Sequence, residues 1–429
     1  MKYITLLLLI TAVFLSCSSE EKNILNQADY DNYLQANNTD AITKAKEELN
    51  FWNKRIKQDS IQLIELSKSA GMQTSIFQQN ASIQQLKNAE KNLTRAALVT
   101  NIGKDGKLLA LAQNYITQHR FKEAKVLVDS ARVIAGGEIS AINFVAFDVA
   151  MELGDYDEAA LFLKKETDFA NYNYLIRLAK WEDYSGNLDK TIQHMEAAKA
   201  IAESSKQKGL LVWVYTNLAD YYGHDGRIKD AYTHYLKALE IDPSNSYAKK
   251  GIAWISFSYE NNPEEALRII TSIEQQSESP DYELLKAEIY ESTGDKELAA
   301  TAMNNFLEQV SNPQYGDMYG AYLVEIHAAN PETSQQAITL ALKEVENRPT
   351  PMSYDLLAHA YYGNGDYKKA LEIAQEHVIG YTYEPMAQFH TAQIYKALDM
   401  QNELAPIKKE LLEASFELGP VTYKEIQNL

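Results

Sequence analysis

The sequence is poor in residues that cross-link or interrupt a chain. Its 429 residues include a single cysteine, Cys17, so no disulfide can form within the chain. Ten prolines and eighteen glycines are few for this length, which suits helices. Positive charge is also scarce, because 41 lysines and arginines stand against 59 aspartates and glutamates, for a net charge of −18. This acidity argues against nucleic acid or an anionic membrane surface as a partner. Basic peptides, cations, glycans or a merely solvated surface stay open.

Motifs of the common catalytic sites are missing as well. The chain has no HExxH, no GxSxG and no glycine-rich phosphate-binding loop. Its eight histidines are scattered, and only His224 and His234 are spaced like a pair of metal ligands, with no thiol or carboxylate evident to complete a set. We therefore expect no catalytic residue, no cofactor and no metal site, and predict that the protein is not an enzyme.

What the sequence does contain is a recurring order of small and large apolar residues. The order is clearest in residues 212–245, where spacings of three and four place each set on one helix face. Gly226 interrupts the first helix, and Pro243 ends the second by removing a backbone donor. The residues of this pattern are Tyr215, Leu218, Ala219, Tyr222, Ala231, Tyr235 and Ala238.

This order resembles the tetratricopeptide repeat, a helix–turn–helix unit of about 34 residues, with Tyr215 at the place of the family's tryptophan. Related patterns recur at intervals of roughly 32 to 40 residues. They occupy residues 105–138, 140–171, 172–208, 247–279, 280–313, 318–350, 351–384 and 385–418. The resemblance implies an all-α fold, a right-handed superhelical solenoid of about nine to ten units whose stacked neighbours form the core and enclose a concave channel. We expect an N-terminal helical region with a degenerate repeat at 41–104, the array at 105–420 and a C-terminal tail at 421–429.

The N-terminus reads MKYITLLLLITAVFLSC, with Lys2 before an apolar run of about a dozen residues, short for a membrane span and suited to a signal peptide. Leu15 and Ser16 before Cys17 resemble a bacterial lipoprotein box, and the acidic residues Glu20 and Glu21 just beyond the cysteine resemble the surface-export signals of Bacteroidetes-type lipoproteins. The resemblance implies removal of residues 1–16, acyl chains such as palmitate on Cys17, and an outer-membrane lipoprotein that faces the periplasm or the cell surface. Residues 17–40, rich in polar side chains, are expected to form a flexible tether. An ordinary secretory signal with an incidental cysteine is the alternative.

In the tetratricopeptide family, first-helix positions that are not used for packing face the concave surface. Carried over by register, they predict an acidic groove with interleaved aromatic rings, suited to lysine or arginine side chains or to stacking on sugars. Asn217 stands where this family often contacts a ligand backbone. The alternative is that these residues merely solvate or seal the groove. The predicted partner-binding residues are Asp148, Glu152, Lys180, Asp183, Tyr184, Trp213, Thr216, Asn217, Asp220, His224, Glu288, Glu291, Tyr319, Tyr322, Asp355, His359 and Tyr362.

These patterns together predict a non-catalytic, membrane-anchored scaffold for protein–protein interaction. The groove chemistry suits a protein partner in the cell envelope that offers a basic or extended peptide segment. The alternative function is a SusD-like outer-membrane lipoprotein that captures glycans or other nutrients. Proteins of that type interrupt their repeats with long loops, whereas the intervals here are even.

Overall fold

The computed structural model describes residues 23–57, 62–137 and 139–429, so the predicted signal peptide and lipidation site Cys17 lie outside the described residues. The helices begin with α1 (Gln27–Gln35), α2 (Thr39–Asn53), α3 (Leu63–Asn80), α4 (Ile83–Val99), α5 (Lys104–Thr117), α6 (Phe121–Ala135), α7 (Ser140–Glu152), α8 (Tyr156–Lys165), α9 (Tyr172–Tyr184), α10 (Leu188–Ser205), α11 (Lys208–His224) and α12 (Ile228–Ile241). They continue with α13 (Ser246–Trp254), the π-helical turn η1 (Ile255–Tyr259), α14 (Pro263–Glu274), α15 (Asp281–Thr293), α16 (Lys296–Val310), the 3-10 turn η2 (Pro313–Tyr315), α17 (Gly320–Ala328), α18 (Ser334–Asn347), α19 (Pro351–Gly363), α20 (Tyr367–His377), α21 (Pro385–Ala397), α22 (Gln401–Glu413) and α23 (Ser415–Gln427).

Helices pair into hairpins that stack in chain order. Ten such pairs, from α3–α4 to α21–α22, follow one another through the described residues. Ala219, Ala231 and Ala238 are fully buried where α11 and α12 approach, as expected of small residues between closely packed helices. Gly226 adopts a left-handed conformation (φ 72°) that ends the first helix of this pair, a conformation that glycine adopts at little energetic cost. The predicted all-α superhelical solenoid is confirmed.

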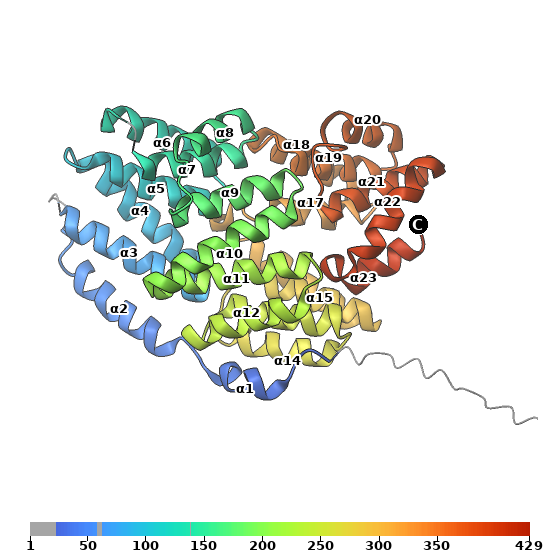
Figure 1. Ribbon diagram of the computed structural model, residues 1–429, viewed down its shortest axis with the longest axis horizontal. Coiled ribbons are helices and arrows are strands. Elements are labelled where there is room, and N and C mark those ends of the chain that lie inside the picture. The colour runs from blue at the N-terminus through green and yellow to red at the C-terminus, as the bar shows by residue number, and fades with distance from the viewer. Residues whose placement is uncertain (1–22, 58–61, 138) are drawn as a thin grey trace, which may run out of the picture.

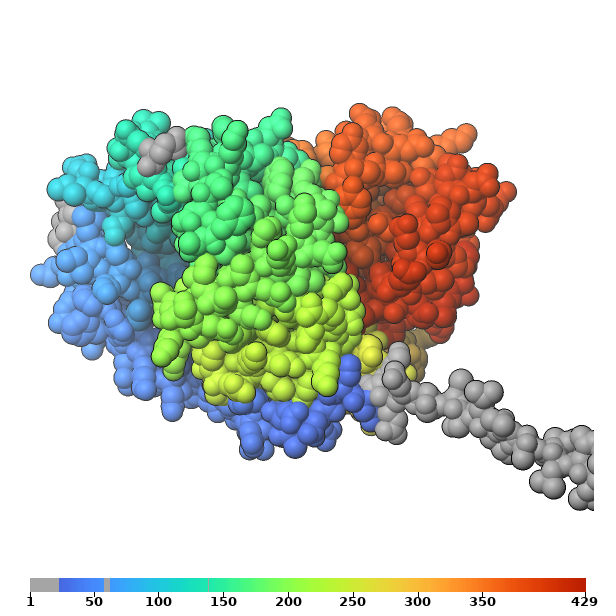
Figure 2. All heavy atoms as spheres, viewed as in Figure 1, coloured from blue at the N-terminus to red at the C-terminus, as the bar shows by residue number. Residues whose placement is uncertain are grey.

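The superhelix winds far enough for its second turn to meet its first. In Figure 1 the C-terminal helices α18–α23, in orange and red, return beside α7–α11, and Figure 2 shows their atoms meeting those of the green first turn. Asn347 Nδ2 donates to the carbonyl oxygen of His119 at 3.1 Å, and Trp254 Nε1 donates to that of Phe416 at 3.0 Å. The concave channel expected from the repeats is therefore partly filled by the chain's own C-terminal units.

Part of the segment expected to be a flexible tether is instead structured. Helix α1 packs against α12 and α14, and Tyr30 is buried with its hydroxyl donating to Glu265 at 2.7 Å. The backbone N–H groups of Ile24 and Leu25 donate to one carboxylate oxygen of Glu260. Specific polar and aromatic contacts thus hold residues that composition alone assigns to a tether. At the other end, the expected tail at 421–429 lies mostly within α23, which packs on α11, η1 and α15.

Lys249 ties the same N-terminal segment to the array and yields a testable pH effect. Its side chain is fully buried, and Nζ donates to the carbonyl oxygen of Ala36 at 3.0 Å. Burial lowers the pKa of this ammonium group to about 8 from its ordinary 10.5. Between those two values the folded chain binds fewer protons than the unfolded chain, so this group makes the free energy of unfolding rise with pH.

We therefore expect native protein to gain stability relative to Lys249→Met as the pH increases from about 8 to about 10.5. Urea denaturation of both proteins across this range measures the difference. A difference that does not change with pH would contradict the assignment.

Candidate functional site

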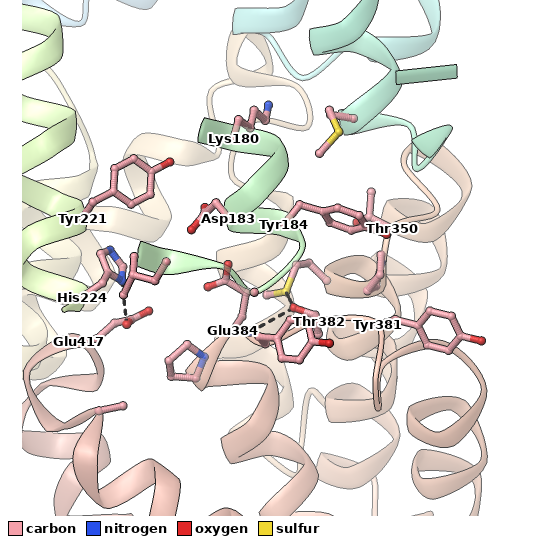
Figure 3. A pocket seen from close by; sticks show the side chains of 18 of the residues that line it. Lys180, Asp183, Tyr184, Tyr221, His224, Thr350, Tyr381, Thr382, Glu384 and Glu417 are labelled. Carbon is pink, nitrogen blue, oxygen red and sulfur yellow. Dashed lines mark hydrogen bonds and ion pairs between the residues drawn. The ribbon is translucent and has the colours of Figure 1, made fainter. Parts of the chain in front are cut away.

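The main cleft lies where the two superhelical turns face each other, with a volume of roughly 620 Å³. One wall comes from the C-terminal ends of α7, α9 and α11, and the other from residues 381–385 and from α22 and α23 (Figure 3). It brings together five of the residues predicted from register, namely Glu152, Lys180, Asp183, Tyr184 and His224. Successive first helices supply them at equivalent places, which is why the register could find them.

Glu152 is the best-satisfied carboxylate of this cleft. It accepts from Lys180 Nζ at 2.9 Å and lies 3.3 Å from Nη1 of Arg348, which comes from the second turn. Burial alone would raise the pKa of Glu152, but the charges of Lys180 and Arg348 outweigh burial and hold the pKa below its usual range. Lys180 and Arg348, the two basic side chains of the cleft, are therefore both paired with Glu152.

The opposite end of the cleft has carboxylates in excess. His224 Nδ1 pairs with Glu417 at 2.8 Å, while Asp183 and Glu384 lie close by (Figure 3). Burial raises the pKa of Asp183, and burial together with the charge of Glu417 raises that of Glu384. One histidine among three acids leaves a place that favours an additional cation.

Tyrosine rings line the remaining surface of the cleft. Tyr156 and Tyr184 stack with their centroids 4.0 Å apart, and Tyr221 extends from α11. Tyr381 and Tyr383, from the loop between α20 and α21, are 55% and 57% exposed. Rings that are both solvent-accessible and beside carboxylates can stack on apolar stems or accept a cation on their faces.

A second cleft of roughly 670 Å³ lies at the N-terminal half of α11, against the α12–α13 connection. It contains Trp213, Thr216 and Asn217. Trp213 is 41% exposed and meets Tyr172 edge-on. Thr216 is buried, and its hydroxyl donates to backbone carbonyl oxygens of its own helix. It is therefore a packing residue rather than the free groove residue predicted. Asn217 donates to the carbonyl oxygen of Trp213.

Several other predicted residues are engaged in contacts within the chain. Asp148 pairs with Arg177 at 2.6 Å, and Asp220 accepts the hydroxyls of Tyr235 and Tyr247. These carboxylates stabilise the stacking of neighbouring units. Register predicts Asp148 and Asp220 as partner contacts, but both carboxylates are already bonded to side chains of the protein itself.

The residues predicted nearer the C-terminus fall into three further groups. Tyr319 is buried and, like Tyr322, packs on Phe306. The predicted groove residue Asp355 is 2% exposed and pairs with His390, which corrects that assignment. His359 stacks on His390, and Tyr362 stacks in turn on His359. Glu288 and Glu291 lie on α15 and face α23.

The prediction from repeat register included no residue of the second wall of the main cleft. Arg348, Tyr381, Tyr383, Glu384 and Glu417 lie far from the first wall in sequence, and no local periodicity indicates which turns meet. One signal was present in the sequence. Residues 381–385 read YTYEP, an aromatic connection between repeats whose other loops are mostly glycine and polar residues.

Two family models match parts of the chain. The model described as tetratricopeptide repeat matches residues 168–244, and the one described as virulence factor membrane-bound polymerase, C-terminal, matches residues 266–394. Residues 168–244 contain the α9–α12 hairpins, whose helices α9 and α11 contribute to one wall of the main cleft. This part of the chain therefore consists of tetratricopeptide repeats. No curated protein sequence matches the chain.

Solved structures of similar architecture have low sequence identity. A tetratricopeptide repeat protein from Parabacteroides merdae is 16% identical, with a TM-score of 0.39, over 57% of this chain and 93% of its own. Yeast Tom70 is 13% identical, with a TM-score of 0.37, over 94% and 99%. Human IFIT1, a dimer with m7Gppp-AAAA, is 14% identical, with a TM-score of 0.46, over 79% and 77%. At these scores the similarities carry no information on what this chain binds.

Two further properties concern only the part of the chain that the structure describes. Within it, no helix is both long and apolar enough to cross a bilayer. Within the same residues, no three histidine, cysteine, aspartate or glutamate side chains are grouped so that they could hold a metal ion.

Proposed function

We propose that this protein is a non-catalytic scaffold that binds a basic, extended segment of a cell-envelope protein in its main cleft. The tetratricopeptide fold suggests a protein-interaction role, and the cleft supplies the specificity. The observation that carries the proposal is the charge of the cleft lining. Six carboxylates stand against Lys180 and Arg348, both of which already contact Glu152. The carboxylates are Glu152, Asp183, Glu384, Glu410, Glu413 and Glu417.

The tyrosines make the cleft suited to a peptide rather than to a simple cation. Tyr184 and Tyr381 come from opposite walls of the cleft, and such rings can pack on the stem of a lysine or arginine whose charged end meets a carboxylate such as Asp183 or Glu384. An extended segment presents alternate side chains to opposite sides, which matches a cleft with two functional walls.

Membrane attachment through acyl chains on Cys17 completes the proposal. Helix α1 starts at Gln27 and is docked on the array. The ten peptide units between Cys17 and Gln27 span at most about 35 Å. Such an anchor would keep the array near the membrane surface and restrict its partners to proteins of the envelope.

The test is binding of labelled peptides by the mature chain. Peptides of one length carrying lysine and arginine are compared with matched glutamate peptides, using native protein and the variant Asp183→Asn/Glu384→Gln/Glu413→Gln. Each lost charge contact is worth up to about 1 kcal/mol, so we expect affinity for the best basic peptide to fall by about tenfold to 150-fold. Neutralisation should leave folding intact, because burial already disfavours the charges of Asp183 and Glu384.

The matched control neutralises three exposed acids away from the cleft, Glu297, Glu308 and Glu332. It changes the net charge equally and should keep native affinity. Equal losses in both variants would reduce the effect to overall charge, and equal binding of basic and acidic peptides would sink the proposal.

The second cleft favours glycan capture as the competing function. Trp213 offers an exposed ring beside the amide groups of Asn217 and Asn245, a combination suited to sugars. Saturable binding of an oligosaccharide that Trp213→Ala abolishes, with no preference among the peptides, would favour this alternative.

A further inference from the structure

The second superhelical turn touches the first through a short series of contacts that we name the seam. On the second turn, the seam consists of Pro349, Tyr383, Phe416, Glu417 and Gly419. We propose that the C-terminal units close onto the inner face of the first turn along this seam as an acid-stabilised clamp, which opens as the pH rises. The inference does not depend on the proposed partner, because closure is a property of the free chain.

Second-turn residues fill positions that glycine leaves empty. A Cβ built on Gly154 would lie 2.7 Å from the carbonyl oxygen of Pro349, and one on Gly186 would lie 2.6 Å from the ring of Tyr383. The seam thus consists of separate close contacts at glycine positions rather than a continuous apolar surface.

The start of α23 is held as a bound peptide would be. The carbonyl oxygen of Phe416 accepts two side-chain donors of the first turn, Trp254 Nε1 at 3.0 Å and Ser258 Oγ at 2.6 Å. Gly419 interrupts the helix with φ 75° and ψ 167°, where a Cβ would meet Glu288 and Trp254. Two donors on one backbone carbonyl provide specificity with little buried apolar area.

The apolar anchors of α23 belong to the C-terminal units. Leu418 and Ile426 pack in one cluster with Phe389, Tyr395 and Leu411, from α21 and α22. Phe416, by contrast, packs against the cluster of the first turn. The seam can therefore separate while the C-terminal core stays assembled.

Acids face acids across this seam, with histidine as the main counter-charge. His224 on α11 faces Glu417 from α23, Asp183 from α9, Glu384 from the 381–385 loop and Asp220 from its own helix. On α15, Glu288 lies beside Glu291 and beneath Gly419.

Farther along α23, Glu425 is influenced by Glu291 and by His390 of α21. His390 in turn faces Asp355 and Glu325. The two lysines that bond the end of α23, Lys396 and Lys408, contact backbone carbonyl oxygens rather than these carboxylates.

The proton affinities of these groups give the sign of the effect. Burial, then the charge of Glu291, raises the pKa of Glu288 to about 7 from its ordinary 4.5. Burial also raises the pKa of Glu384 and of Glu425. Burial alone would lower the pKa of His224, but the contact with Glu417 outweighs it and raises that pKa.

Each of these groups binds its proton more tightly in the closed form than it would when exposed to solvent. For Glu288, the cost of closing is absent below about pH 4.5 and complete above about pH 7. The raised pKa values of Glu384 and Glu425 act in the same direction. The contribution of the His224 pair is present below 6.5 and is lost as the pH rises through the raised pKa. Both effects weaken closure in the same direction.

The experiment measures the distance between spin labels on the two turns. Cysteines replace the exposed Lys229 on α12 and Lys368 on α20, in full-length protein with Cys17→Ser. We expect one short interspin distance near pH 5, and near pH 8 an added longer population, with a change in the open-to-closed ratio of at least about tenfold.

Two variants keep the test decisive. Glu288→Gln removes one titrating charge of the seam and should lower the open population near pH 8, whereas Glu297→Gln, an exposed control on α16, should behave as native. Ser258→Ala removes one donor to Phe416 and should increase the open population near pH 5. An interspin distance that is independent of pH in native protein, or equal responses of the two glutamine variants, would overturn the proposal.

Discussion

Replacing Asp355 with alanine is expected to lower the free energy of unfolding by about 3 to 5 kcal/mol, the largest effect of any single change considered for this chain. Asp355 is 2% exposed, and its Oδ2 lies 2.8 Å from Nδ1 of His390, which is 4% exposed. Removing the carboxylate leaves an imidazole group in the interior without its charge partner. His359, stacked on His390 at 3.8 Å, offers a ring face and no compensating charge.

The pH dependence of this loss distinguishes a charge pair from simple packing. Burial alone would lower the pKa of His390, but Asp355 outweighs it and raises the pKa. The pair therefore contributes its full stability below the ordinary pKa of 6.5, and that contribution is lost as the pH rises through the raised value.

Urea denaturation at several pH values should show the largest loss for Asp355→Ala in mild acid. Asp225→Ala, which removes an exposed aspartate, serves as the control. A loss in Asp355→Ala that is constant across pH would contradict the charge pair.

Gly251→Ala is expected to cost about 2 to 3 kcal/mol, a large effect for one added methyl group. The ring of Tyr235 lies directly against Gly251, so that a Cβ there would overlap the ring. Tyr235 is 6% exposed and its hydroxyl donates to Asp220, so the ring cannot move aside without losing that hydrogen bond. Thermal and urea denaturation measure the loss.

A double-mutant cycle identifies the cause of this loss. In a Tyr235→Leu background the ring is absent, and adding Gly251→Ala should cost less than about 1 kcal/mol. Additive losses would mean that the glycine acts through its own helix and not through the ring.

The local sequence pattern was sufficient to predict the helical hairpins, but it could not predict how the C-terminal units pack against the first superhelical turn. Ala219 and Ala231 could be placed from sequence because their spacing determines which helix face they occupy. First-helix register predicts both Asp355 and His224 as groove residues, yet Asp355 is buried with a histidine and His224 lies in the main cleft. The difference comes from where the second turn meets the first. That contact depends on small rotations between units that accumulate along the array.

The N-terminal segment illustrates the same limit. Residues 24–36 have tether-like composition, but Tyr30 and the backbone N–H of Leu25 find partners on Glu265 and Glu260, more than two hundred residues away in sequence. Composition reports what a segment can do alone and does not include acceptors supplied by distant helices.

The central claim is that the main cleft holds a peptide segment of an envelope protein, and photocrosslinking in intact cells tests it most directly. A photoreactive phenylalanine analogue replaces Tyr381 in the cleft or, as the control, Tyr367, an exposed tyrosine on α20 outside the main cleft. We predict a crosslink from position 381 to a lysine- or arginine-containing segment of one membrane-associated protein, lost when Asp183, Glu384 and Glu413 are neutralised, and none from position 367. Equal crosslinking from both positions, or none from 381 that depends on those acids, would contradict the account.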